Sequence, residues 1–266
     1  MRVASRRWAE DLASWRIPDQ ILQVAPESPW EFPIGLFEQR ADASLDRWTP
    51  SNAAAWDALP DGGSVLDVGC GGGAASLPLA ARAGRLVGVD VSGRLLAEYE
   101  RRARALVADV VVLEGLWSEV ASDAPVGDVA VCHNVAYNVP DLAAFVTELT
   151  RHARRRVVLE LTRQHPMHAL NELWLRFHGL RRPDRPTAED AEAVLREVGL
   201  TPESASWVPD EPMEVVLDRQ ALVAWTRRRL CLPPERDAEV DEAIGEVGGL
   251  PARPMVTFWW AGAASR

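Results

Sequence analysis

Residues 64–92 read SVLDVGCGGGAASLPLAARAGRLVGVDVS, and this stretch decides the fold. Residues 65–68 form a short apolar run with the pattern of a buried parallel strand. The glycine-rich segment 69–73 follows, then a run of Ala, Leu and Arg that predicts a helix, then a second apolar strand over 85–89. Asp90 ends that strand, where a carboxylate can accept both hydroxyls of a ribose. A strand, a glycine turn, a helix and a strand ending in an acid make one half of a doubly wound nucleotide-binding fold.

The acidic residues beside the glycine turn indicate the charge of its ligand. A loop that binds pyrophosphate directs backbone N–H groups and a helix N-terminus at an anion, so nearby negative charge is unfavourable. Asp67 stands two residues before the first glycine, where we expect the ligand to rest. This charge suits S-adenosylmethionine, which carries an ammonium and a sulfonium and no phosphate. An NAD-type fold without methyl chemistry remains the alternative.

The motifs D67-V-G-C-G-G-G73 and G88-V-D90 resemble those of the class I S-adenosylmethionine-dependent methyltransferases, and the resemblance extends over roughly residues 49–261. It implies an α/β fold with a doubly wound, seven-stranded, mostly parallel sheet whose last two strands are joined antiparallel. It also implies that S-adenosylmethionine is the cofactor. The cofactor contacts that it assigns in this part of the chain are Asp67, Gly69, Cys70, Gly71, Gly73, Asp90 and Val91.

Bulk composition limits the function classes. The chain has 266 residues with 47% hydrophobic residues, which is enough for one α/β domain with additional elements. Its net charge of -10 argues against a surface for nucleic acid or anionic membrane. The three cysteines are scattered without metal-ligand spacing, which suits a reducing cytoplasm and predicts no metal site. We therefore expect a cytoplasmic protein with neither nucleic-acid nor membrane partners.

Additional segments flank and interrupt the expected domain. Residues 1–60 are helical and proline-rich, and such segments often cover the cofactor in the resembled family. We therefore expect a lid over 1–60 and the methyltransferase domain over 61–266. Helical insertions are expected at about 166–186 and 212–250. The second insertion either completes the acceptor pocket or forms a homodimer surface, and the sequence leaves both open.

Loops after the middle strands are expected at the ligand end of the sheet, because ligands bind beyond the carboxyl ends of the strands in open α/β sheets. Leu116 and Trp117 follow the third strand and match the adenine-binding loop of the resembled family. An indole can stack on adenine, although Trp117 alternatively belongs to the core. The fourth strand ends at Cys132, followed by His133, and both are expected near the reacting end of the cofactor.

His133 is the first candidate for a general base, because a neutral imidazole there can take a proton from a hydroxyl or amine. It alternatively forms a hydrogen bond with the cofactor or the backbone. Candidate contacts with the methyl acceptor are Trp30, Phe37, Tyr137, His165, His168, Trp174 and His178. Each of these histidines can instead make a structural hydrogen bond, and the two aromatic residues before residue 60 can instead complete the core.

Three functions follow from these features. The acidic composition and the aromatic lid favour a methyltransferase that acts on an oxygen or nitrogen of a small molecule. A protein or RNA methyltransferase is the second hypothesis, although RNA would require a basic track at the active edge. A non-catalytic cofactor-binding protein, or an NAD-type oxidoreductase, is the third. The cofactor that raises the melting temperature distinguishes the last from the first two.

Overall fold

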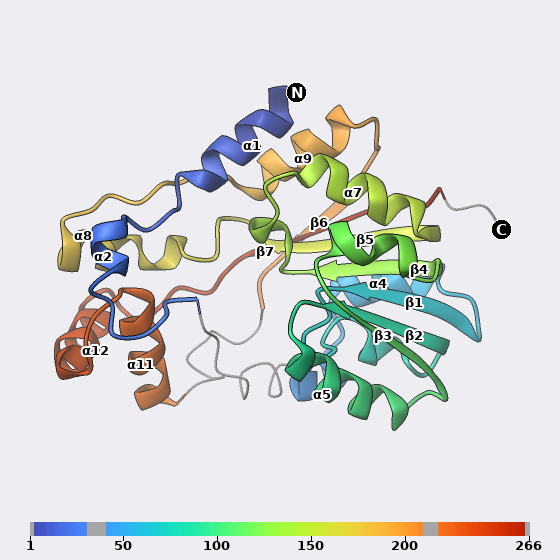
Figure 1. Cartoon of the computed structure of the whole chain (residues 1–266), viewed down its shortest axis with the longest axis horizontal. Coiled ribbons are helices and arrows are strands. Elements are labelled where there is room, and N and C mark those ends of the chain that lie inside the picture. The colour runs from blue at the N-terminus through green and yellow to red at the C-terminus, as the bar shows by residue number, and fades with distance from the viewer. Residues whose placement is uncertain (1–2, 31–40, 210–217, 264–266) are drawn as a thin grey trace.

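A seven-stranded sheet forms the centre of the computed structural model, which describes residues 3–30, 41–209 and 218–263 (Figure 1). The strands are β1 (Gly63–Val68), β2 (Ala83–Asp90), β3 (Asp109–Glu114), β4 (Gly127–His133), β5 (Ala153–Thr162), β6 (Glu203–Trp207) and β7 (Met255–Ala261). Their order is β3-β2-β1-β4-β5-β7-β6. Strands β1 to β5 pair in parallel, whereas β7 runs antiparallel to both β5 and β6. The predicted fold class is confirmed.

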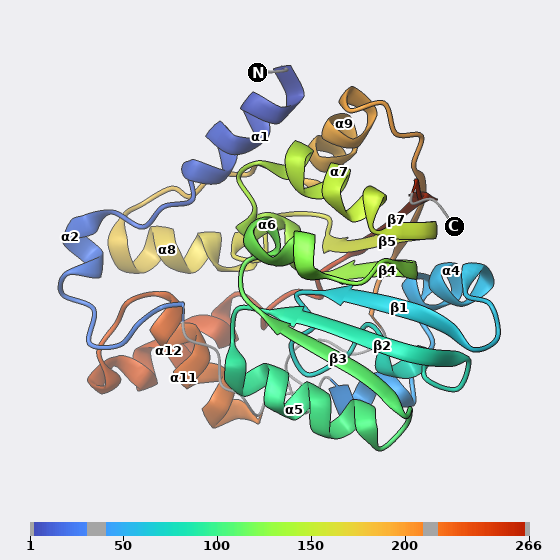
Figure 2. The same ribbon diagram turned by 45° about the vertical axis from the view of Figure 1, so that its right-hand side comes forward.

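Helices cover both faces of this sheet (Figure 2). One face packs against α4 (Pro50–Ala58), the short 3₁₀ turn η1 (Leu77–Leu79) and α5 (Gly93–Arg104). The other face packs against α1 (Val3–Ala13), α6 (Trp117–Val120), η2 (Ala121–Asp123), α7 (Leu142–Arg151) and α9 (Ala188–Glu197). A further turn, η3 (Ala136–Asn138), joins β4 to α7.

The alternating direction of side chains along each strand explains why the sheet has a hydrophobic core on each face. Val65 belongs to the cluster under α4 and α5, and the next residue, Leu66, belongs to the cluster under α1 and α7. On the neighbouring strand β4, Val131 belongs to the cluster under α4 and α5, and Cys132 belongs to the cluster under α1 and α7. Because successive side chains of a strand point to opposite faces, an apolar run of this kind is buried on both sides.

The segment after the glycine turn corrects one sequence prediction. Residues 74–82 form turns and the three-residue η1, and the expected helix is absent. Nine helical residues would rise only about 14 Å, whereas the chain must return along the six residues of β1, a length of about 20 Å. The segment is therefore too short to return as a helix, and it follows a more extended path.

A third core lies apart from the sheet. It is formed by α2 (Asp19–Leu22), the η4 turn (His168–Leu170), α8 (Asn171–His178), α11 (Arg219–Arg229), η5 (Pro234–Arg236) and α12 (Asp237–Glu246). We call these elements, with the chain that joins them, the helical cap; they lie together at one end of the sheet in both views (Figures 1 and 2). Both expected insertions are thus helical where the structure describes them, and they pack on each other.

Where the structure describes them, the first sixty residues pack in three different places. Helix α4 packs against β4, β5 and β7, so it completes a layer of the sheet. Helix α1 packs against α7 and α9, and the Glu197 carboxylate accepts hydrogen bonds from the backbone N–H groups of Ala4 and Ser5. Within the described residues of this region, α2 joins the helical cap through Ile21 and Leu22. The expected boundary at residue 60 therefore separates elements that pack into the same core.

Candidate active site

A cavity of about 1940 Å³ lies between the carboxyl ends of the strands and the helical cap. Gly69, Asp90 and His133 line it from the sheet, and Trp174 and Trp225 line it from the cap. Pockets for one small ligand usually measure roughly 300–1,000 Å³. The cavity is therefore large enough for two ligands side by side.

The backbone of the glycine turn is occupied by hydrogen bonds within the protein. The N–H groups of Gly69 and Cys70 both donate to the carbonyl of Val89, and that of Gly71 donates to Asp90 Oδ2 at 2.9 Å. The N–H of Gly73 donates to the carbonyl of Cys70. No α-helix begins in residues 69–82, so the turn also lacks a helix N-terminus that could face a phosphate. This geometry argues against a pyrophosphate site.

Asp90 is fixed at the cavity wall with room for further hydrogen bonds. Its Oδ1 accepts from the N–H of Ser92 at 2.9 Å, and its Oδ2 accepts from Gly71. Each carboxylate oxygen has two lone pairs, so each can still accept one hydroxyl. The carboxylate can therefore take the two hydroxyls of a ribose while holding the glycine turn.

Three other residues expected at the cofactor also line this part of the cavity. Val91 and Leu116 are exposed on its wall. Trp117 is 5% exposed, and its indole Nε1 is buried without a hydrogen-bond acceptor among the described residues. An orphaned buried donor requires an explanation, and a polar ligand atom supplies one.

Asp67 does not lie where the sequence argument put it. Its side chain is 0% exposed and absent from the cavity lining, because Oδ2 accepts from Ser76 Oγ at 2.6 Å beneath the turn. Burial raises the pKa of Asp67 to about 7, and the charge of Asp90 adds to that rise. Its Oδ1 has no partner among the described residues. The expected direct contact of Asp67 with the ligand is therefore wrong for this conformation.

Other motif residues also shape the site from outside it. Cys70, Gly73 and Cys132 are absent from the cavity lining, and both cysteines are buried. Gly73 adopts a φ of +96°, and a Cβ there would come within 2.6 Å of Leu77 Cγ. This position needs glycine for the path and packing of the turn.

His133 and Glu160 face each other across adjacent strands at the cavity wall. The two residues are paired in the β4–β5 register, and His133 Nδ1 is 3.6 Å from Glu160 Oε2. Glu160 is held by Ser51 Oγ, which donates to Oε2 at 2.6 Å, and by Asn134 Nδ2, which donates to Oε1 at 3.2 Å. His133 Nε2 is buried without a partner among the described residues. The nearby carboxylate favours a proton on Nδ1, which leaves Nε2 free to accept another.

Tyr137 and His165 line the cavity but are held in structural contacts. The Tyr137 hydroxyl donates to the carbonyl of Thr162 at 2.8 Å, and burial raises the pKa of Tyr137 above its usual range. His165 stacks on Trp15 with ring centroids 3.9 Å apart. Burial, together with the charge of Arg182, lowers the pKa of His165 to about 3, so this imidazole is neutral at physiological pH.

Of the remaining residues expected to contact the acceptor, some line the cavity and others do not. Trp30 and Trp174 line the cavity, whereas Phe37 lies outside the described residues. His168 is absent from the lining of the large cavity, and its Nε2 is 3.3 Å from Asp184 Oδ1. His178 is also absent from it, since its Nε2 contacts the carbonyl of Leu230 at 2.7 Å. No group of three or more His, Cys, Asp or Glu among the described residues is placed to hold a metal ion.

Sequence reasoning missed several cavity residues in and beside the cap. The cavity is also lined by Trp15, Arg182, Trp207, Trp225 and Arg229. The available signal was the proximity of tryptophan and arginine at residues 15–16 and 225–229. That pattern does not show which segments of a chain meet.

The family comparison agrees with the nucleotide-binding half of the fold. Residues 65–156 match the family model described as a methyltransferase domain. This match supports the resemblance of the motifs at 67–73 and 88–90 to the class I S-adenosylmethionine-dependent methyltransferases. The matched range covers β1 to β4 and the start of β5, and it includes Asp90 and His133.

Two curated relatives share this region. The chain is 33% identical over 92 residues to a ubiquinone biosynthesis O-methyltransferase of Alkalilimnicola ehrlichii, and 29% identical over 90 residues to the protein of the same name from Rickettsia akari. Each match covers 34% of this chain, and the matches cover 37% and 36% of the respective relatives. The chain thus matches little more than a third of the length of either relative.

Solved structures share the fold over most of the chain. A cyclopropane-fatty-acyl-phospholipid synthase-like protein from Lactobacillus casei superimposes with a TM-score of 0.59 at 16% identity, covering 91% of this chain and 98% of that one. The YcgJ protein of a Bacillus species gives a TM-score of 0.55 at 17% identity, covering 84% of this chain and 100% of that one. At these identities the likeness establishes the fold alone. No helix in the described part of the chain has the length and apolar character needed to cross a membrane.

Proposed function

We propose that the protein is a methyltransferase that transfers a methyl group from S-adenosylmethionine to an oxygen or nitrogen atom of a small molecule. The observation that carries this proposal is the large cavity at the strand ends, where Asp90 faces space for a nucleoside beside a turn in which the N–H groups of Gly69, Cys70 and Gly71 are already bonded. The methyltransferase match over residues 65–156 supports it. The names of the curated relatives favour oxygen as the atom methylated.

The residues present fit this cofactor. Asp90 would accept the ribose hydroxyls, and Trp117 would offer its unpartnered Nε1 beside the adenine. Acidic side chains gather in this part of the cavity lining, where Glu119 and Asp141 join Asp90. Negative charge favours a cationic ligand and disfavours a diphosphate.

When bound, S-adenosylmethionine supplies an electrophilic methyl carbon on a sulfonium that keeps the electron pair of the broken carbon–sulfur bond. His133 would receive the proton that the acceptor loses, on Nε2, while Glu160 would hold the ring and stabilise the resulting charge. Ser51 and Asn134 fix the Glu160 carboxylate from two directions. The walls of the cavity would orient the acceptor, and orientation alone can lower a barrier by roughly 7–11 kcal/mol.

The other hypotheses fit the cavity less well. The helical cap stands opposite the strand ends, so a protein or RNA strand would have to enter between two packed parts of the molecule. A dinucleotide would require free N–H groups in the glycine turn, and those of Gly69, Cys70 and Gly71 are bonded within the protein. Both observations favour a small acceptor and a cofactor without a diphosphate.

Cofactor binding tests the first half of the proposal. Replacing Asp90 by alanine removes the ribose acceptor and the hydrogen bond from Gly71, so we expect S-adenosylmethionine affinity to fall by roughly 100-fold, corresponding to about 2.7 kcal/mol. Calorimetric titration of the full chain measures it. Asp109→Ala is the matched control. Asp109 begins β3, at the edge of the sheet opposite to Asp90, and its carboxylate pairs with Arg85. Unchanged affinity in Asp90→Ala, or wild-type binding of NAD in place of S-adenosylmethionine, would contradict the proposal.

Turnover tests the role of His133. With the phenol or amine that the wild type methylates fastest in a screen, His133→Gln should lower kcat by roughly 10²–10⁴-fold. Its S-adenosylmethionine affinity should change little. His168→Gln is the control, since that side chain lies outside the large cavity. Full turnover by His133→Gln would remove this residue from the mechanism.

A further inference from the structure

We infer that the methyl acceptor is a planar aromatic carboxylic acid, whose carboxylate binds at Arg182 and Arg229 on the helical-cap side of the cavity. This inference rests on the proposed function and adds the chemical class of the acceptor. Its basis is the division of charge along the cavity, two buried N–H donors without acceptors, and a wall of tryptophan rings.

Among the described lining residues, the acids and most of the arginines come from different parts of the molecule; Arg47, just before α4, is the exception. The acids other than Glu160 belong to β2, α6 and the region of α7; they are Asp90, Glu119, Asp141 and Glu148. Around the helical cap and the chain before β7, the charged lining residues are Arg16, Arg182, Arg229 and Arg253. No acid from the described part of the cap lines the cavity. Arg16 is ion-paired with Asp19 at 2.8 Å, and the excess of arginine over acid among the described lining residues of this end complements an anionic ligand.

Arg182 is held rigidly at this basic end. Its guanidinium lies over the rings of Trp15 and Trp174, at 5.5 and 5.0 Å from their centroids. Nη1 donates to the carbonyl of Arg16 at 3.2 Å, and Nη2 donates to the carbonyl of Trp15. The Nε–H is buried without an acceptor among the described residues. A ligand that satisfies it must bring an acceptor, and a carboxylate also brings the opposite charge.

A second cation and a second donor come from α11. Arg229 is only 3% exposed, and its guanidinium lies 5.5 Å from the ring centroid of Trp225. Burial lowers the pKa of Arg229 to about 10, so it remains charged at neutral pH. The indole Nε1 of Trp225 is buried and has no acceptor in the described part of the chain. One buried and one partly buried cation, with two buried donors that have no acceptor among the described residues, favour a group that only accepts hydrogen bonds.

The aromatic wall indicates the shape of the ligand body. Trp15, Trp174 and Trp225 all line the cavity, although each is at most 5% exposed. Their faces already contact His165, Arg182 or other side chains, so the ring edges left at the cavity suit edge-to-face contacts with an aromatic ligand.

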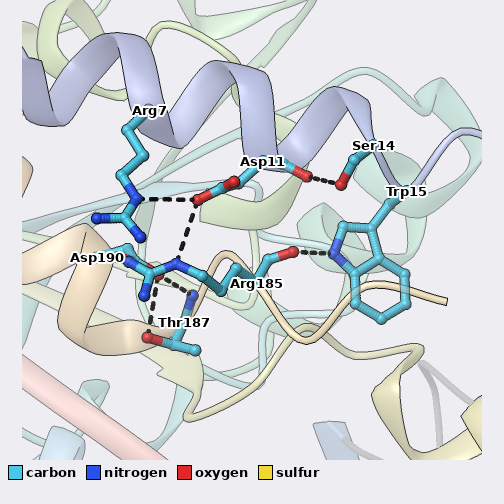
Figure 3. A network of polar contacts seen from close by, with 7 residues as sticks. All are labelled: Arg7, Asp11, Ser14, Trp15, Arg185, Thr187 and Asp190. Atoms are coloured by element: carbon cyan, nitrogen blue, oxygen red, sulfur yellow. Dashed lines mark hydrogen bonds and ion pairs between the residues drawn. The ribbon is translucent and has the colours of Figure 1, made fainter.

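Trp15 is locked in place, because its Nε1 donates to the carbonyl of Arg185 (Figure 3). The side chain of Arg185 in turn bonds Asp11 of α1 and Asp190 of α9 (Figure 3). This network fixes one wall before any ligand arrives, which lowers the entropic cost of binding.

Paired ligands of equal shape test the inference. The full chain, saturated with S-adenosylhomocysteine, is titrated calorimetrically with 2-naphthoate, benzoate and phenylacetate, and with the amide of each. We expect at least one acid to bind at least tenfold more tightly than its own amide. The preference should fall to about twofold or less in Arg182→Gln and persist in part in Arg182→Lys. Arg181→Gln is the matched control, since that neighbouring arginine is exposed and absent from the cavity lining.

Further measurements distinguish the loss of a carboxylate contact from a general loosening of the helical cap. Arg182→Gln loses contacts with two backbone carbonyls, so the melting temperature and the S-adenosylhomocysteine affinity of each variant are measured as well. Trp225→Phe keeps an aromatic ring but removes the five-membered ring of the indole together with its N–H, and we expect it to weaken acid binding severalfold and to change amide binding less. Amides that bind as tightly as their acids, or a wild type that binds none of the acids, would overturn the inference.

Titrations without S-adenosylhomocysteine separate the two proposals. A protein that prefers the acids and does not bind the cofactor would contradict the proposed function and leave the acid-binding end intact. A protein that binds the cofactor and shows no preference for acids would contradict the inference about the acceptor and leave the proposed function intact.

Discussion

At the scale of single residues, the carboxyl groups of the motif have different environments. Asp90 stands at the cavity wall and accepts hydrogen bonds from two backbone N–H groups. Asp67 is fully buried, with one hydrogen bond from Ser76 and one oxygen without a partner among the described residues. Burial disfavours the charged form of a carboxyl group. The same residue type therefore lines the cavity in one place and is a buried titrating group in the other.

The raised pKa of Asp67 predicts how the stability of the ligand-free protein depends on pH. The pKa rises from 3.8 to about 7 on folding, so the folded state holds the proton over a range where the unfolded state has released it. The stability from this protonation is complete below pH 4 and is lost as the pH rises towards 7. The full loss is on the order of 4 kcal/mol, since each pKa unit is worth about 1.4 kcal/mol.

Asp67→Asn tests this directly, because asparagine cannot ionise. Urea unfolding at pH 5 and pH 8 should show that the variant loses less stability between the two values than the wild type, by roughly 1–3 kcal/mol. His165 and the other titrating groups are present in both the wild type and Asp67→Asn, so their contributions cancel when the two stability changes are subtracted. Asp61→Asn, at an exposed position before β1, is expected to follow the wild type. Parallel curves for the wild type and Asp67→Asn would disprove the burial argument.

At the scale of elements, the sheet was predictable because its strands carry a local signal. Apolar runs bounded by glycine or by an acid mark β1 and β2, and the antiparallel β7 follows from the family resemblance. Helix α9 begins at Ala188 with Thr187 as its N-cap, a residue type that favours this position. Such ends are set by neighbouring residues, so the sequence shows them.

The elements predicted wrongly are those whose shape depends on distance in space. The Ala-rich run after Gly73 has helical composition, but the length of β1 decides its path. Asn134 adopts a φ of +61° at the end of β4, and its side chain donates to Glu160, which is 26 residues away in sequence. Neither effect leaves a mark in a local pattern. The strand ends of the candidate site were therefore readable from the sequence, whereas its cap side was not.

At the scale of the whole molecule, two separately packed parts face each other across the cavity. The sheet has a core on each face, and the helical cap has its own core. The cap is assembled from three segments distant in sequence, around residues 17–25, 167–180 and 221–250. Under the proposed function, the cofactor would contact the strand ends of the sheet and the acceptor would contact the cap, so the cap could vary its ligand without changes to the cofactor site.

This division predicts that the cap can be destabilised on its own. Leu173 is buried in the cap core and does not line the cavity, so Leu173→Ala should cost the cap roughly 2–5 kcal/mol. In hydrogen-exchange mass spectrometry, we expect α8, α11 and α12 to exchange faster, with β1 and β4 unchanged. S-adenosylhomocysteine affinity should stay within about twofold, whereas binding of aromatic acids should weaken. Leu149→Ala, an equally buried change in α7, is the matched control and should loosen the sheet core. Faster exchange throughout the sheet in Leu173→Ala would show that cap and sheet unfold as one unit.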